Sequence, residues 1–146
     1  MNTLHEGGCL CGAIRYRVSA DAKALTHCHC HSCRHALGAP SVAWAIFPRD
    51  AFEYLYGEPA RYRSSAQVVR TFCRECATSL TWEHEDRSLT MDVTTASIDD
   101  ADVFAPTREI WIGEKLAWQM LDPTLPHYPR NTTDSAPIVP APTPQA

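Results

Sequence analysis

Seven cysteines lie in three close groups along this chain of 146 residues, and cysteine is the side chain best suited to soft metal ions and to thiol chemistry. The groups are Cys9-x-Cys11, Cys28-x-Cys30-x-x-Cys33 and Cys73-x-x-Cys76. Cysteines one or two residues apart rarely meet the geometry of a disulfide, and an odd number would leave one thiol unpaired. The spacing therefore favours metal binding over disulfide bonds.

The seven thiols can be divided into a closed set of four and an open set of three. The closed set combines the two distant pairs, Cys9, Cys11, Cys73 and Cys76. Four thiolates complete a tetrahedral zinc site, and a zinc ion that joins distant segments stabilises a fold. In an extended segment Cys9 and Cys11 would point the same way, and a Cys-x-x-Cys turn would bring Cys73 and Cys76 together. Iron is the alternative metal for this set and would give a coloured protein.

The open set consists of Cys28, Cys30 and Cys33, within the run HCHCHSCRH. Three thiolates leave the fourth position of a zinc ion available to water or substrate. Such an electron-rich zinc activates water poorly but can hold an exogenous thiol as its thiolate. Two alternatives remain open, a nucleophilic cysteine without metal and a structural site closed by a histidine. The histidines of this run are His27, His29, His31 and His35, and we expect them to face solvent or to lie behind the ligands.

Short segments of alternating or β-branched residues predict a mostly β fold. The expected strands span residues 12–18, 41–47, 52–57, 68–73, 79–83, 88–93 and 108–112. One or two helical turns are expected in SCRHALG, with Gly38 as the residue that ends them. Length and composition predict a single domain over residues 1–130, followed by a Pro-rich tail over residues 131–146.

Charge and hydropathy exclude several classes of protein. The formal net charge is −4 and the basic residues are scattered, which argues against a nucleic-acid-binding surface. No apolar run approaches the roughly 20 residues that a membrane-spanning helix needs. The first residues, MNTLHEGGCLCGAIRY, have no secretory signal pattern, so we expect a cytoplasmic protein.

The chain resembles the glutathione-dependent formaldehyde-activating enzyme family, whose zinc domain also occurs in centromere protein V. The motifs that carry the resemblance are GGCLCGAIRYRV, HCHCHSCR, TFCRECATSL and IWIGEKLAWQMLDPTLPHYP, and together they cover about residues 6–129. The resemblance implies small coiled antiparallel sheets around a structural zinc. It also implies two zinc ions per chain, one structural at Cys9, Cys11, Cys73 and Cys76 and one catalytic at Cys28, Cys30 and Cys33, although the catalytic site can be empty.

The implied activity is that of a carbon–sulfur lyase, which forms or breaks the adduct between a thiol such as glutathione and a small aldehyde such as formaldehyde. Sulfur would attack the aldehyde carbon, and His29, His31 or His35 could protonate the oxygen. Arg34 could bind a carboxylate of the substrate. The alternative, from a different class, is a non-catalytic zinc module that binds a thiol or a protein partner. An exchangeable fourth ligand in a pocket distinguishes the enzyme from the module.

Two positions depart from the family pattern. Ala77 stands where the family usually has glycine, so the turn after Cys76 is expected to be strained or different. His35 stands where the family often has lysine. If position 35 helps to hold glutathione, this protein would prefer another thiol.

Overall fold

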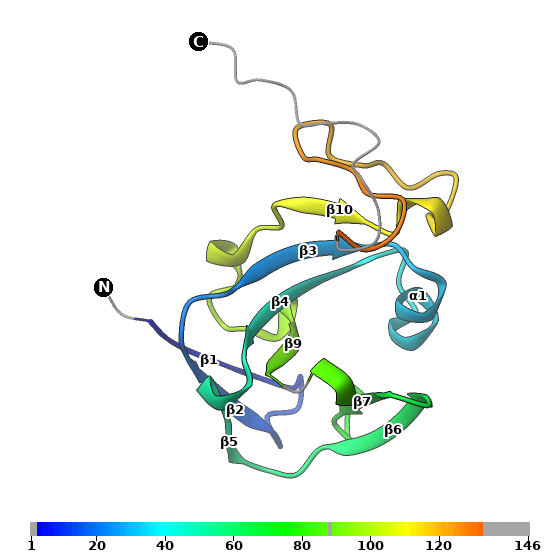
Figure 1. Ribbon diagram of the computed structural model, residues 1–146. Coiled ribbons are helices and arrows are strands. Elements are labelled where there is room, and N and C mark those ends of the chain that lie inside the picture. The colour runs from blue at the N-terminus through cyan, green and yellow to red at the C-terminus, as the bar shows by residue number, and fades with distance from the viewer. Residues whose placement is uncertain (1–2, 88, 133–146) are drawn as a thin grey trace. The chain divides into compact units, whose positions relative to one another are not determined.

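The computed structural model describes residues 3–87 and 89–132 and is mostly β (Figure 1). The described residues divide into two compact units, unit 1 within 3–24 and 45–105 and unit 2 within 25–44 and 106–132. The single domain expected over 1–130 stays a prediction, and the expected tail lies outside the described residues from 133 onward. Within residues 3–87 and 89–132, no helix is long and apolar enough to cross a membrane.

Unit 1 contains a three-stranded antiparallel sheet in the order β1-β2-β5. Its strands are β1 (Leu4–Gly8), β2 (Arg15–Ser19) and β5 (Phe52–Tyr56). In β2, Tyr16 and Val18 are buried while Arg15 and Arg17 remain partly exposed, which confirms the expected alternation. Arg17 donates a hydrogen bond of 2.9 Å from its guanidinium to Glu6 on β1. The sheet therefore has one apolar face and one charged face.

The second group of strands in unit 1 runs antiparallel in the order β6-β7-β8-β9. Its members are β6 (Ala60–Ser65), β7 (Val68–Phe72), β8 (Ser79–His84) and β9 (Thr90–Thr94). Short 3-10 turns connect strands at Arg49–Ala51, Glu85–Arg87, Thr95–Ser97 and Ala101–Phe104. Phe47, Leu80 and Val93 are completely buried and form part of the core.

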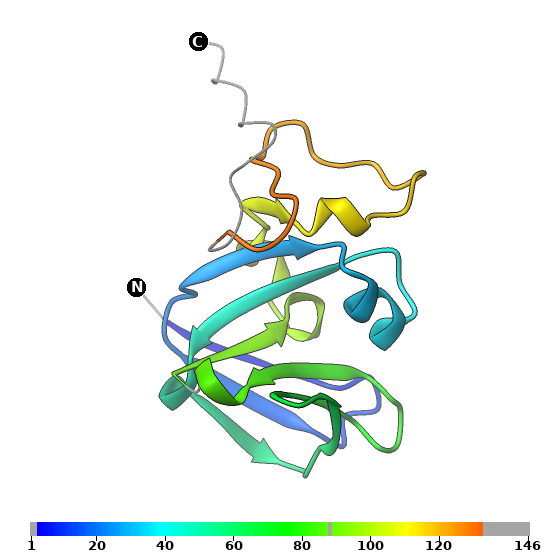
Figure 2. The ribbon, with the colours of Figure 1, turned by 45° about the vertical axis from the view of Figure 1, so that its right-hand side comes forward.

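Unit 2 is built around two parallel strands, β3 (Ala24–Cys28) and β10 (Arg108–Ile110), which lie side by side in Figures 1 and 2. Only the first residue of β3 belongs to unit 1. β4 (Val42–Pro48) starts in unit 2 and continues into unit 1. After the short turn Ile112–Glu114 the chain runs without regular structure and returns to β10, where the Tyr128 N–H bonds to the Glu109 carbonyl at 2.8 Å.

The one helix of the described residues, α1 (His31–Leu37), confirms the expected helical turns. It begins because the Cys30 sulfur accepts a hydrogen bond from the Cys33 N–H at 3.3 Å, as an N-cap side chain does. It ends at Gly38, whose φ of 61° is the left-handed conformation that glycine adopts without strain.

Three strands were not predicted from the sequence, and several predicted boundaries differ from the structure. The missed strands are β1, β3 and β6. β1 ends in two glycines and β6 is largely exposed and polar, so neither shows the apolar alternation that identifies a half-buried strand. The strand expected over 12–18 begins only at Arg15, because residues 9–12 form a turn. The strand expected over 108–112 ends at Ile110, because Trp111 adopts a φ of 59°.

Candidate metal centres

The four cysteines expected to form the closed set meet in unit 1. Their Sγ atoms, from Cys9, Cys11, Cys73 and Cys76, all lie within 4.8 Å of one another. The Sγ atoms of Cys9 and Cys11 are 3.7 Å apart, and those of Cys11 and Cys73 are 3.8 Å apart. Tetrahedral zinc with Zn–S bonds of about 2.3 Å separates its sulfurs by about 3.8 Å. The donor set therefore fits a zinc ion.

The first pair converges through a turn, not through the extended segment that we expected. The Gly12 N–H bonds back to the Cys9 carbonyl at 3.1 Å, and Gly12 has a φ of 79°. The Ile14 N–H donates to the Cys9 sulfur at 3.2 Å. Burial raises the pKa of Cys9, but hydrogen bonds from Ile14 and from neighbouring thiols lower it on balance. The turn thus presents both sulfurs and supports the thiolate form of one of them.

The second pair lies in the expected Cys-x-x-Cys turn, closed by a hydrogen bond of 2.8 Å from the Ala77 N–H to the Cys73 carbonyl. Thr78 was not predicted to contribute, yet it connects the two turns. Its hydroxyl oxygen accepts from the Leu10 N–H at 3.0 Å and lies 3.2 Å from the Cys76 sulfur. Hydrogen bonds from the Thr78 side chain and from the Thr78 and Cys11 N–H groups lower the pKa of Cys76 to about 5. Cys76 is thereby prepared for metal binding.

Ala77 has a φ of 65°, so the departure from glycine places a β-carbon in the left-handed region. This conformation costs an alanine roughly 1–2 kcal/mol. Glycine avoids that strain but loses more backbone entropy on folding, so the net gain from the substitution is smaller. We expect Ala77→Gly to stabilise the protein by about 1 kcal/mol, measured as a rise of about 3 °C in the thermal unfolding midpoint. The matched control is Gly12→Ala, where φ is 79° and an added Cβ would meet no atom within 4 Å. Gly12→Ala should lower the unfolding midpoint. A lower midpoint for Ala77→Gly would contradict the claim that Ala77 is strained.

The three cysteines of the open set meet in unit 2, where a strand passes into a helix. Cys28 ends β3, Cys30 caps α1 and Cys33 lies in the first turn of α1. Their Sγ atoms all lie within 4.8 Å of one another, and those of Cys28 and Cys33 are 3.8 Å apart. The thiols of Cys30 and Cys33, together with burial, raise the pKa of Cys28, so three thiolates at this point require a cation. This donor set also fits zinc.

The histidines around the open set lie in two different environments. Within the described residues, the group of three thiols includes no histidine nitrogen, so the alternative of a histidine-closed site has no ligand there. His31 and His35 are exposed on α1, with ring centroids 4.1 Å apart. His29 is completely buried. Of the proton donors expected from the sequence, only His31 and His35 are therefore accessible.

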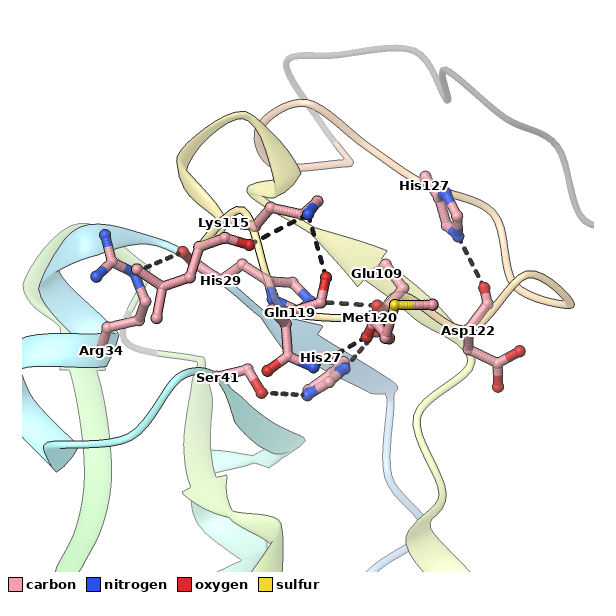
Figure 3. A network of polar contacts seen from close by, with 11 residues as sticks. His27, His29, Arg34, Ser41, Glu109, Lys115, Gln119, Met120, Asp122 and His127 are labelled. Carbon is pink, nitrogen blue, oxygen red and sulfur yellow. Dashed lines mark hydrogen bonds and ion pairs between the residues drawn. The ribbon is translucent and has the colours of Figure 1, made fainter.

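His27 and His29 meet Glu109, as Figure 3 shows. Glu109 lies opposite His27 in the parallel register of β10 and β3. One carboxylate oxygen bonds to His27 Nδ1, and the other lies 3.1 Å from His29 Nε2. Burial raises the pKa of Glu109, but hydrogen bonds from the two imidazoles outweigh it and lower that pKa to about 2. Glu109 was not predicted as a site residue. The only hint in the sequence was that an acidic residue lies inside the strand expected over 108–112.

Arg34 and His35, the two residues expected to bind substrate, share a groove of about 460 Å³ in unit 2. The groove is lined by Arg34, His35, Gly38, Ala39, Pro40, Leu116 and Trp118. The Arg34 guanidinium donates to the carbonyl oxygens of His29 at 3.4 Å and of Glu114 at 3.3 Å. These long hydrogen bonds orient the guanidinium while leaving further N–H donors.

Comparison with solved structures supports this fold. A Rhodobacter sphaeroides protein of known crystal structure superposes with a TM-score of 0.56 over 69% of this chain and 96% of that one. At 19% sequence identity, this likeness concerns the fold alone.

Comparison of sequences places the chain in a family. An uncharacterized lyase of Schizosaccharomyces pombe is 32% identical over 76 residues, which are 52% of this chain and 55% of that protein. The match thus spans about half the length of this relative. Residues 4–114 match the family described as glutathione-dependent formaldehyde-activating enzyme, and these residues include both cysteine sets. The chain therefore belongs to the glutathione-dependent formaldehyde-activating enzyme family.

Proposed function

We propose that this protein is a zinc-dependent carbon–sulfur lyase that forms or breaks the adduct between a thiol, glutathione or a similar one, and a small aldehyde. The observation that carries the proposal is the convergence of the thiols of Cys28, Cys30 and Cys33. In the part of the chain that the structure describes, no histidine nitrogen belongs to this group. Family membership supports the substrate class, and the name of the Schizosaccharomyces pombe relative supports a lyase.

Cys28, Cys30 and Cys33 would hold the catalytic zinc, and Cys9, Cys11, Cys73 and Cys76 the structural zinc. Zinc bound by three thiolates would supply a position at which an external thiol is kept deprotonated and nucleophilic near neutral pH. Cys30 would have two roles, because its sulfur also caps α1. The helix therefore begins at the site, and the side chains of its second turn are fixed relative to the three thiols.

Arg34 and His35 would bind and orient the thiol substrate. The free N–H donors of Arg34 can form charge-assisted hydrogen bonds with a carboxylate of glutathione. Leu116 and Trp118 give the same groove an apolar wall, and Trp118 is 69% exposed and thus accessible to a ligand. A thiol that carries a carboxylate and short methylene segments, as glutathione does, would match this combination of groups.

The chemical step needs a proton as well as a nucleophile. The thiolate sulfur attacks the aldehyde carbon, a carbon–sulfur bond forms, and the electron pair of the carbonyl π bond moves to oxygen. A proton from His31 or His35, both exposed on α1, would convert this oxygen to the hydroxyl of a hydroxymethyl thioether. In the opposite direction the same histidine removes the hydroxyl proton and the carbon–sulfur bond breaks.

The test is two-dimensional exchange NMR on equilibrated mixtures of formaldehyde and glutathione. This method measures the interconversion of free thiol and adduct even when no net reaction occurs. Zinc-loaded protein is expected to accelerate the exchange above its rate in buffer, and further thiols and aldehydes define the preference. Exchange at the buffer rate with every thiol tried would contradict the proposal and would favour a non-catalytic zinc module.

Arg34→Gln is expected to raise the KM for glutathione about tenfold with little change in kcat, because a hydrogen bond to a charged group contributes roughly 1.5 kcal/mol or more. The matched comparison uses 2-mercaptoethanol, which has no carboxylate and whose KM should not change. Arg74→Gln, an exposed substitution in unit 1, is the control variant. Equal losses for both thiols would show that Arg34 positions α1 and does not bind a carboxylate.

A further inference from the structure

The cluster of His27, His29 and Glu109 offers donor atoms that the proposed lyase chemistry does not use. Residues alternate in direction along an extended chain, so the pattern His27-Cys28-His29-Cys30 separates imidazoles from thiols. Cys28 and Cys30 join Cys33, while His27 and His29 join Glu109. The end of β3 therefore supports two groups of possible ligands with different chemistry.

We propose that His27, His29 and Glu109 form a further metal site, which takes a divalent transition-metal ion such as Zn²⁺, Co²⁺ or Fe²⁺. One ligand atom from each residue lies within 4.8 Å of the other two. Two imidazoles and one carboxylate are a donor set typical of such ions, and three protein ligands leave positions for water. This donor set is harder than either cysteine set, so the site would differ from them in metal preference.

The surroundings of the cluster are those of a prepared metal site. The second ring nitrogen of His27, Nε2, lies 2.7 Å from the Ser41 hydroxyl, which fixes the orientation of the imidazole as the outer contacts of metal ligands usually do (Figure 3). The backbone of Glu109 is hydrogen-bonded on both sides. Its N–H donates to the Pro126 carbonyl at 2.9 Å, and its carbonyl accepts from the Tyr128 N–H at 2.8 Å. The strand backbone that carries Glu109 is therefore fixed before any ion binds.

Burial gives an energetic reason for a cation. His29 and Glu109 have no exposed surface, and burying a carboxylate is costly unless positive charge and hydrogen bonds compensate it. In the cluster, Glu109 is compensated only by its contacts with His27 Nδ1 and His29 Nε2. A divalent ion would compensate the carboxylate with a larger charge than an imidazole carries.

The test is a titration with Co²⁺ of protein that carries two zinc ions per chain, one for each cysteine set, followed by calorimetry and visible absorption. Cobalt bound by nitrogen and oxygen gives ligand-field bands without the intense sulfur-to-metal bands of a thiolate site. We expect the wild type to bind one such ion per chain, and Glu109→Gln to lose it. Because Glu109 is buried, the half-exposed His27→Gln and Ser41→Ala provide variants that keep the fold, and each should weaken binding at least about tenfold.

His127→Gln is the matched control. His127 is buried in the same unit, but its Nε2 lies 2.8 Å from the Asp122 carbonyl and not against Glu109. This variant should keep the additional ion with unchanged affinity. The proposal is overturned if the wild type binds no ion beyond those held by sulfur, or if His27→Gln and Ser41→Ala bind Co²⁺ as tightly as the wild type. Neither result depends on adduct turnover, so the proposed function is tested separately.

Discussion

Replacing Cys73 with serine is expected to remove one zinc ion per chain and most of the stability of the protein. Cys73 is 1% exposed, and its sulfur faces the turn of Cys9 and Cys11 from far along the sequence. Structural zinc contributes roughly 10–16 kcal/mol of apparent binding free energy, whereas whole domains are stable by only about 5–15 kcal/mol. Loss of one of four ligands therefore threatens the fold as a whole. Elemental analysis and thermal unfolding measure the two effects.

The control for this variant is Glu75→Gln in the same turn. Glu75 is exposed and lies between the two cysteines of the motif, so its substitution should leave zinc content and unfolding midpoint unchanged. If Cys73→Ser is insoluble, gradual removal of zinc from the wild type by a chelator gives the same information. Unfolding that is unaffected by complete loss of zinc would show that the four thiols do not hold a structural ion.

Cys30→Ser is expected to have the opposite profile, with one zinc ion lost, the fold retained and adduct exchange reduced to its rate in buffer. Serine is among the best N-cap residues, so the hydroxyl can replace the sulfur that accepts from the Cys33 N–H. Helix α1 should therefore still begin at the same residue. The variant removes a thiolate ligand without removing the structural role of residue 30. Circular dichroism, zinc content and exchange NMR measure the three effects.

Ser32→Ala provides the matched control for Cys30→Ser, because Ser32 is exposed in the first turn of α1 and is not part of the thiol group. It should retain zinc and exchange activity. Full activity of Cys30→Ser after loss of its zinc would contradict a catalytic role for the open set. Loss of the fold in Cys30→Ser but not in Ser32→Ala would assign the three thiols a structural role.

The features predicted correctly from the sequence are those set by local spacing. The convergence of Cys28, Cys30 and Cys33, the turn around Cys73 and Cys76 and the end of α1 at Gly38 each depend on a few adjacent residues. The mostly β fold followed from short alternating segments such as β2. Ala77 is a similar case, because the expected strain at one backbone position is found there as a positive φ.

The features that could not be predicted depend on contacts between distant segments. Glu109 meets His27 only because β10 pairs in parallel with β3, and β3 itself was not recognised as a strand. Thr78 links the turn of Cys9 and Cys11 to the turn of Cys73 and Cys76, and this link depends on how the two turns lie in the structure. The groove beside Arg34 needs the segment around Trp118, which has no regular structure and therefore no periodic signal.

Cadmium NMR of the Cd²⁺-substituted protein during a titration with glutathione tests the central claim most directly. The chemical shift of cadmium reports how many sulfurs bind it, so the set of four and the set of three give separate signals. We predict that glutathione shifts the signal of the Cys28, Cys30 and Cys33 site towards that of four sulfurs and leaves the other signal unchanged. If glutathione moves neither signal, no external thiol binds at the open set, and the proposed lyase mechanism is wrong.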